Sequence, residues 1–179
     1  MSNDCAQTSS RGCGNLAELR GAVAVSDNNL ACHGTISLLR CGMVKSTGIY
    51  QGDYNCQLTH GPSGQLIETD APKDNHGRGL AFSPTDLFCA SLGSCMVTTM
   101  AIAAKNRLGF DLTGAKWEVT KEMSNDAPRR IARITTTVWL PIPRTQDPEG
   151  VLERAGLACP VKKSLSADVD TPIIFHWAE

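Results

Sequence analysis

Two cysteines and one arginine, Cys95, Cys159 and Arg78, are the residues of this chain best suited to chemistry. Cys95 lies inside a run from Leu87 to Ala104 that contains no charged residue, which predicts a thiol in the middle of a buried helix. A thiol reacts as the thiolate, and apolar surroundings disfavour that charged form. Two interpretations of Cys95 therefore stay open: a small buried apolar residue, as most free cysteines are, or a reactive thiol supported by a cation.

The helix that carries Cys95 has clear start and stop signals. Ser83 can cap the first backbone N–H groups, Pro84 suits the first helical position, and Asp86 stands where the acid of a capping box would. Basic residues in the last turn and Gly109 after it predict the end of the helix. A helix this apolar on all sides is expected to be buried.

The dipole of this helix cannot activate Cys95. The thiol lies ~18 Å along the axis from Ser83, at ~1.5 Å per residue, whereas the dipole acts within about the first turn. A cation from elsewhere must therefore reach Cys95 if it reacts. Arg78, between two glycines in the polar loop before the helix, is the best-placed candidate, and a turn-forming surface arginine is the alternative.

Cys159 has a different local setting. It directly precedes Pro160 and is expected to be the N-cap of a short helix over Val161–Leu165. The helix N-terminus and the nearby Lys162 and Lys163 predict that Cys159 is the more acidic of the two thiols. The alternative is an N-cap cysteine without a partner.

The remaining pattern predicts an α+β domain. Polar and apolar residues alternate in the segments before and after the long helix, which is the period of half-buried strands. Prolines 141, 143 and 148 predict a rigid linker after the fourth strand. The expected strands cover residues 49–59, 65–69, 115–121, 131–140 and 173–177, and short helices cover 149–157 and 161–165.

Length and charge exclude several classes of protein. A chain of 179 residues can form one domain with a sizeable core, and its net charge of −1 gives no general attraction to nucleic acid or anionic membranes. The run from Leu87 to Ala104 is shorter than the ~20 residues of a membrane span and contains four hydroxyl side chains, so we interpret it as a core helix. The N-terminus lacks a secretory pattern, which favours a cytoplasmic protein.

Eight cysteines are many for a chain of this length. None forms a C-x-x-C pair, and the N-terminal ones lack the spacing of a zinc knuckle, so we expect no metal and no bound cofactor. The pattern favours reduced thiols, one or two of them reactive, over a disulfide framework. The cysteines that receive no role are Cys5, Cys13, Cys32, Cys41, Cys56 and Cys89.

Residues 1–42 differ from the rest of the chain. They are rich in Gly, Asn, Ser and Cys and predict no confident element, and the character changes directly after Met43. Two interpretations stay open: Met43 is the natural start and residues 1–42 are an upstream extension, or these residues form a loosely ordered arm. Either way, residues 43–179 are expected to form the domain.

Six motifs along the chain carry a resemblance to a known family: Ser83-Pro84-Thr85-Asp86-Leu87, Ser91-Leu92-Gly93-Ser94-Cys95, Cys159-Pro160-Val161, His60-Gly61-Pro62-Ser63-Gly64, Asp70-Ala71-Pro72 and Ile174-Phe175-His176-Trp177. Together they resemble the OsmC/Ohr family of thiol-dependent hydroperoxide reductases. The similarity runs from about Ile49 to the C-terminus and leaves residues 1–42 out. Family members are intertwined homodimers in which antiparallel sheets wrap around two long central helices, and the resemblance implies the same here.

The resemblance also implies a function. Cys95 would be the peroxidatic cysteine, which reduces an organic hydroperoxide to the alcohol and becomes a sulfenic acid. Cys159 would be the resolving cysteine, and an external dithiol of lipoyl or other type would reduce the resulting disulfide. No metal or organic cofactor takes part in this cycle.

One position departs from the family pattern. Peroxidases of the family carry a glutamate ten residues before the reactive cysteine, where it orients an arginine, and here that residue is Thr85. Asp86 is next to it but faces the opposite side of the helix from Cys95. This departure favours the alternative function, a non-catalytic dimeric binding or redox-sensing protein built on the same scaffold.

Overall fold

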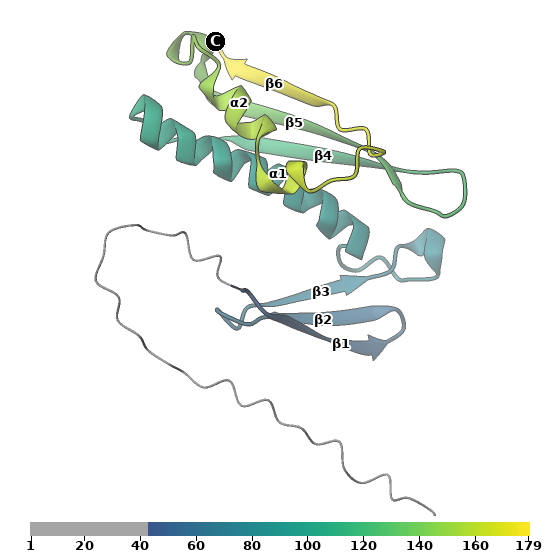
Figure 1. Cartoon of the computed structure of the whole chain (residues 1–179). Coiled ribbons are helices and arrows are strands. Elements are labelled where there is room, and N and C mark those ends of the chain that lie inside the picture. Colours follow the sequence, from purple (N-terminus) through teal and green to yellow (C-terminus); the bar gives the residue numbers. More distant parts are fainter. Residues whose placement is uncertain (1–42) are drawn as a thin grey trace, which may run out of the picture. The chain divides into compact units, whose positions relative to one another are not determined.

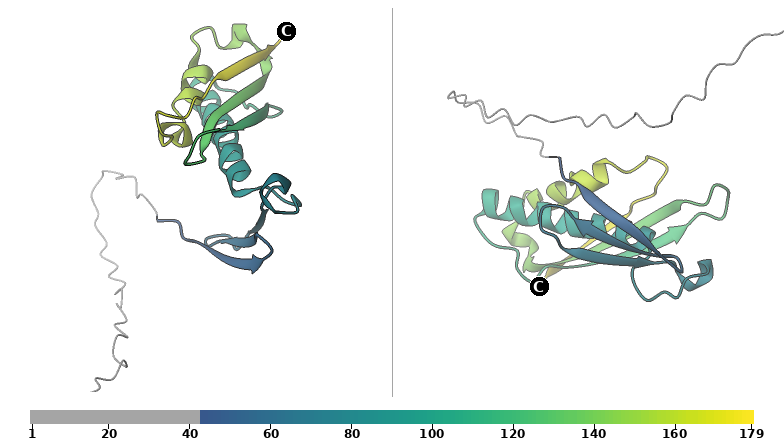
Figure 2. Two further views of the ribbon diagram at one scale, coloured as in Figure 1. Left: turned by 90° about the vertical axis from the view of Figure 1, so that its right-hand side faces the viewer. Right: turned by 90° about the horizontal axis from the view of Figure 1, so that it is seen from below.

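The computed structural model describes residues 43–179 (Figure 1). The predicted N-terminal segment of residues 1–42 lies outside the described residues, together with its four cysteines, so both interpretations of that segment stay predictions. Within the described residues, six strands form two separate three-stranded sheets (Figure 2).

The first sheet consists of β1 (Ser46–Gly52), β2 (Asn55–His60) and β3 (Leu66–Asp70), each antiparallel to the next. The prediction of one strand over residues 49–59 is wrong, because the chain turns at Asp53 and Tyr54. Both residues have positive φ, 45° and 63°, as a tight two-residue hairpin requires. A two-residue turn alone would exchange odd and even positions, but a register shift between Tyr50 and Gly52 restores them, so that Tyr50 pairs with Cys56. The alternation in the sequence therefore runs through the turn without revealing it.

The long helix begins as predicted. It comprises α1 (Pro84–Ala103) and a final π-helical turn, Ala104–Leu108, which ends at Gly109 with φ of 78°. The capping box is formed: the Ser83 hydroxyl accepts from the Asp86 N–H at 3.1 Å, and the Asp86 carboxylate accepts from the Ser83 N–H at 3.0 Å. These local bonds satisfy donors that the first helical turn leaves free.

In the single chain, α1 is buried on one face only. Leu92, Met96 and Met100 are completely buried, whereas Phe88 and Ile102 keep 46% and 57% of their surface exposed. By length and composition, the segment Pro84–Leu108 could also cross a membrane. Its packed face, which lies against β4, β5 and the two short helices (Figure 1), identifies it as a core helix with an apolar side left uncovered.

The second sheet has the order β4 (Lys116–Met123), β5 (Ile131–Pro143) and β6 (Ile173–Ala178). The α+β class is confirmed, and β4 and β5 are antiparallel, but β6 runs parallel to β5. Parallel neighbours need a crossover connection. Here it contains α2 (Val151–Leu157) and α3 (Pro160–Lys163).

The predicted proline linker after residue 140 is wrong in part. β5 continues through Pro141 to Pro143, and its pairing with β6 shifts register between Leu140 and Pro143. Because proline has no N–H to donate, an interrupted ladder at the end of a strand can accommodate it.

Two buried glycines allow close packing around α1, and they should respond differently to substitution. A Cβ at Gly93 would overlap the indole ring of Trp117 on β4, whereas one at Gly156 would meet only the flexible side chains of Met96 and Met100 at 3.0 Å. We expect Gly93→Ala to lower the free energy of unfolding by about 1–3 kcal/mol, even though alanine favours helix by about 1 kcal/mol. Gly156→Ala should lower it much less. Denaturant unfolding of both variants measures the difference, and equal losses would contradict this packing.

Candidate active site

Cys95 is half-buried near the middle of α1. Its backbone carbonyl accepts a hydrogen bond from the Thr99 hydroxyl at 2.8 Å, one turn further along the helix. The thiol packs against the core cluster that includes Leu92 and Met96, and it is less enclosed than Cys89 or Cys159. Among the described thiols of α1, Cys95 is therefore the more accessible one.

Cys159 is completely buried at the start of α3. The predicted N-cap is confirmed, because its Sγ accepts a hydrogen bond from the Lys162 N–H at 3.4 Å. The predicted acidity is wrong: burial raises the pKa of the Cys159 thiol, and the Lys162 N–H only partly opposes that effect. A single helical turn has a weak dipole, so desolvation decides the direction.

The structure brings Cys95 and Cys159 together. After burial and the Lys162 N–H, the next influences on the pKa of Cys159 are the charge of Cys95 and a hydrogen bond with Cys95, both of which raise it. Both influences require the two sulfurs to lie close together. Although the two residues are 64 positions apart, the packing of α3 on α1 makes them neighbours.

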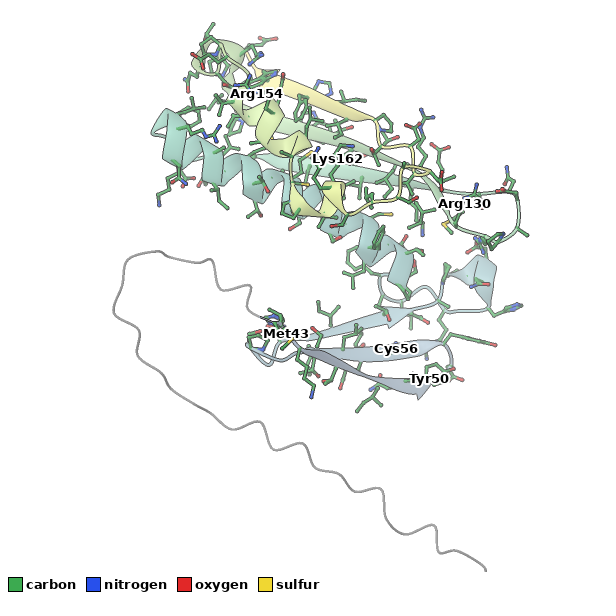
Figure 3. All side chains as sticks on the ribbon, viewed as in Figure 1. Met43, Tyr50, Cys56, Arg130, Arg154 and Lys162 are labelled. Atoms are coloured by element: carbon green, nitrogen blue, oxygen red, sulfur yellow. The ribbon has the colours of Figure 1, made fainter. Side chains whose placement is uncertain are left out.

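Lys162 does not supply the cation that Cys95 lacks. Its ammonium group donates to the Thr171 hydroxyl at 2.6 Å, and its charge is the weakest of the influences on the pKa of Cys159. Figure 3 shows Lys162 on α3, beside the central helix. Lys162 therefore contributes mainly through its backbone N–H.

Arg78 lies in the loop before α1, as predicted, but it is not brought to Cys95 of the same chain. Its Nε is 4.0 Å from Oδ2 of Asp70, and 57% of its side chain is exposed. Asp70 itself is completely buried at the end of β3. Since Asp70 pairs with Phe82 just before α1, this arginine is held near the start of the helix.

Lys121 is a charged residue that the sequence analysis did not single out. From β4 its ammonium donates to Asp86 at 2.6 Å and to Thr85 at 2.8 Å. Burial alone would raise the pKa of Asp86, but the hydrogen bonds from Lys121 and Ser83 outweigh it, so this pKa is lowered. The strand register could have indicated this contact from the sequence, because Lys121 falls on the same side of its strand as Trp117 and Val119.

Cys89 lies on the side of α1 that carries Asp86. Burial raises the pKa of its thiol, while Lys121 acts in the opposite direction and Asp86 adds to the increase. It lines a pocket with Phe82 and Trp117, away from the pair formed by Cys95 and Cys159. A buried thiol with a raised pKa is inert in comparison with an exposed one.

No group of three His, Cys, Asp or Glu side chains able to hold a metal gathers within residues 43–179. The chemistry that the geometry does offer is thiol chemistry. Two adjacent sulfurs, one half-buried and one fully buried, are suited to forming and breaking a disulfide.

The raised pKa of Cys159 leads to a prediction about alkylation. At neutral pH we expect iodoacetamide to modify Cys95 before Cys159, because Cys159 is both buried and largely protonated. Raising the pH above about 9 should narrow the difference. Mass spectrometry of the peptides after timed labelling measures both rates, and faster labelling of Cys159 at pH 7 would contradict the assignment.

Comparisons with known proteins agree with the fold. A proposed osmotic stress induced and detoxification response protein from Psychrobacter arcticus is 38% identical; the match covers 78% of this chain and all of that one, with a TM-score of 0.69. Organic hydroperoxide resistance proteins from Legionella pneumophila and Elizabethkingia anophelis share the fold at 14% and 13% identity. Their matches cover 76% of this chain and 98% and 97% of theirs, both with TM-scores of 0.63.

No curated protein matches the chain. The family of OsmC-like proteins matches residues 76–173, which include Arg78, the whole of α1 and both cysteines of the candidate site. Because this match covers more than half of the chain, and the relative from Psychrobacter arcticus is similar over its whole length, the chain belongs to the OsmC-like protein family.

Proposed function

We propose that this protein is a thiol-dependent peroxidase that reduces organic hydroperoxides to alcohols. The observation that carries the proposal is the contact between the thiols of Cys95 and Cys159. Two family neighbours of the same fold are organic hydroperoxide resistance proteins, which agrees with this reading.

The reaction divides the work between two unequal thiols. The Cys95 thiolate attacks the terminal oxygen of the hydroperoxide, the O–O bond breaks, and the alkoxide leaves and takes up a proton as the alcohol. Cys95 is oxidised to a sulfenic acid. Cys159 then attacks that sulfur and water leaves, which forms a Cys95–Cys159 disulfide. An external dithiol reduces the disulfide, is itself oxidised and returns both thiols.

The unequal burial of the two thiols supports these roles. Burial raises the pKa of the Cys159 thiol, which keeps this thiol from competing with Cys95 for the peroxide. Cys95 is the more accessible of the pair, so the peroxide can reach it first. Cys159 is buried against it and is in place to react as soon as the sulfenic acid forms.

The surroundings favour an alkyl hydroperoxide over hydrogen peroxide. A groove of about 450 Å³ begins one helical turn from Cys95 at Thr99 and next to Cys159 at Ala158, and Ile102 and Ala155 line it. Arg154 borders the groove from α2 (Figure 3). Asn106 and Arg107 also line the groove, so its wall is partly polar. Its apolar part can bind a hydrocarbon group, which hydrogen peroxide lacks.

A homodimer would complete the site. Arg78 is held at Asp70 near the start of α1, while Cys95 lies ~18 Å along that helix at ~1.5 Å per residue. The exposed apolar side chains of Phe88 and Ile102 leave one side of α1 uncovered. We therefore propose that two copies pack through this side, and that Arg78 of one subunit faces Cys95 of the other.

One observation favours the alternative, a non-catalytic binding or redox-sensing member of the family. At the position of the family glutamate, Thr85 contacts Lys121, and no acid on α1 is free to orient Arg78. A slow reaction with peroxide that does not saturate, and that Arg78→Ala leaves unchanged, would support this alternative.

The peroxidase proposal predicts a stoichiometric loss of thiols. One equivalent of cumene hydroperoxide added to the reduced protein should oxidise Cys95 and Cys159 and yield a disulfide-linked peptide pair in mass spectrometry. Cys159→Ser should stop the reaction at a sulfenic acid that dimedone traps on Cys95. Cys89→Ser is the matched control and should react like the wild type, and a protein whose two site thiols both stay reduced would refute the proposal.

Mixing inactive subunits tests the shared site. Arg78→Ala and Cys95→Ser are each expected to lose most activity, but refolding them together at equal amounts should restore about a quarter of the wild-type activity, because half of the dimers contain one complete site. If Arg78 acts within its own chain, no mixed dimer has a complete site. Mixed samples as inactive as the separate variants would therefore rule out the shared site.

A further inference from the structure

Asp70 is an unusual residue to which the proposed reaction assigns no role. Its carboxylate is completely buried at the end of β3. Oδ2 accepts a hydrogen bond from the Leu80 N–H at 3.1 Å and lies 4.0 Å from Nε of Arg78. Oδ1 is buried and has no hydrogen-bond partner within residues 43–179. A buried carboxylate with an unused acceptor is costly and requires an explanation.

No hydrogen bond from the neighbouring strand β2 reaches Oδ1 of Asp70 in the described part of the chain. Asn55 of β2 is the cross-strand partner of Asp70, and its Oδ1 is also buried without a hydrogen-bond partner in the described part of the chain. Arg129, the other arginine close to this loop, is paired with the exposed Asp74 at 3.3 Å. Arg78 is thus the cation in contact with Asp70.

The loop that carries Arg78 is closed tightly over Asp70. The Gly77 N–H donates to the Pro72 carbonyl at 3.1 Å, and the Gly79 N–H donates to the Ala71 carbonyl at 3.2 Å. A Cβ at Gly77 would overlap the Ala71 carbonyl, and Gly79 has φ of 64°. The two glycines that flank Arg78 are therefore required by the loop, which presents this arginine to the buried carboxylate.

A guanidinium group can satisfy both carboxylate oxygens at once. Arginine and a carboxylate form two parallel N–H···O bonds, and such a pair fixes the plane and direction of the guanidinium. Oδ1 of Asp70 offers the second acceptor for such a fork. On α1, by contrast, the Asp86 carboxylate is occupied by Lys121 and Ser83.

We propose that Asp70 is the positioning residue that orients Arg78 toward the Cys95 thiolate. This inference rests on the proposed peroxidase function and adds a residue that takes no part in the thiol chemistry itself. Asp70 is on β3 and not on the helix. Arg78 therefore has an acidic partner even though Thr85 stands in place of the family glutamate. Asp70 acts through Arg78 and touches neither the peroxide nor the thiols.

The test is Asp70→Asn in the full-length dimer. Asparagine has the same shape as aspartate, so we expect the variant to fold. The midpoint of the Cys95 alkylation rate against pH should rise by about one pH unit. The value of kcat/KM for cumene hydroperoxide should fall about tenfold. Asp74→Asn, which breaks the exposed pair on the same loop, is the matched control and should change neither quantity.

Two further variants separate positioning from a purely structural role. In the Arg78→Ala background, Asp70→Asn should cause no additional loss, because Asp70 acts only through Arg78. Asp70→Glu should recover part of the wild-type alkylation profile. If Asp70→Asn does not fold, Arg78→Lys tests the same pair from the other side, since it keeps the charge and loses the fork; it should reproduce the shift in the alkylation profile.

The outcomes distinguish this inference from the function on which it rests. If the wild type reacts rapidly with hydroperoxide but Asp70→Asn has the wild-type alkylation profile, the role of Asp70 is refuted and the peroxidase function stands. Additive losses in the double variant, or a wild-type profile for Arg78→Lys, refute it as well. If wild-type Cys95 does not react with hydroperoxide, the proposed function itself is refuted.

Discussion

The burial of one face of α1 is the interaction on which the rest of the structure depends. Leu92, Met96 and Met100 are completely enclosed, and each contributes about 1.5–3 kcal/mol by leaving water. The second sheet covers this face from one side, where Gly93 admits Trp117, and α2 covers it from another, where Gly156 admits two methionines. The same packing carries α3 to the helix and sets Cys159 beside Cys95.

This arrangement creates the difference between the two thiols. Burial keeps Cys159 protonated by raising its pKa, whereas Cys95 stays partly open to solvent. Two equally exposed thiols would compete for the peroxide. In the proposed reaction, unequal burial would assign the first step to one sulfur and the second step to its neighbour, without any difference in residue type.

The charged side chain of α1 lies at its start, away from the thiol of Cys95. At its start, Lys121 and Ser83 satisfy Asp86 and lower the pKa of that carboxyl, which stabilises the first turn. Cys95 lies more than two turns further along, where neither this network nor the helix dipole acts strongly. The cation that the proposed reaction requires at Cys95 must therefore come from outside the helix, and Arg78 on its closed loop before the helix is the residue we infer.

The sequence by itself determined the features that depend on neighbouring residues. The capping box, the end of the helix at Gly109, the N-cap at Cys159 and the α+β class follow from contacts within a few positions, and the structure confirms them. The two cysteines and Arg78 were selected from the sequence. The roles of the cysteines came from resemblance to a family, whereas the role of Arg78 came from its position in the loop before the helix.

Only the tertiary structure decided the features that depend on distant residues. The parallel pairing of β6, the contact of Lys121 with Asp86 and the burial of Asp70 join segments whose separation the local pattern does not encode. The acidity of Cys159 was predicted in the wrong direction for the same reason. Its local signal was a helix N-terminus, but desolvation depends on everything packed around the thiol, and that is decided by the fold.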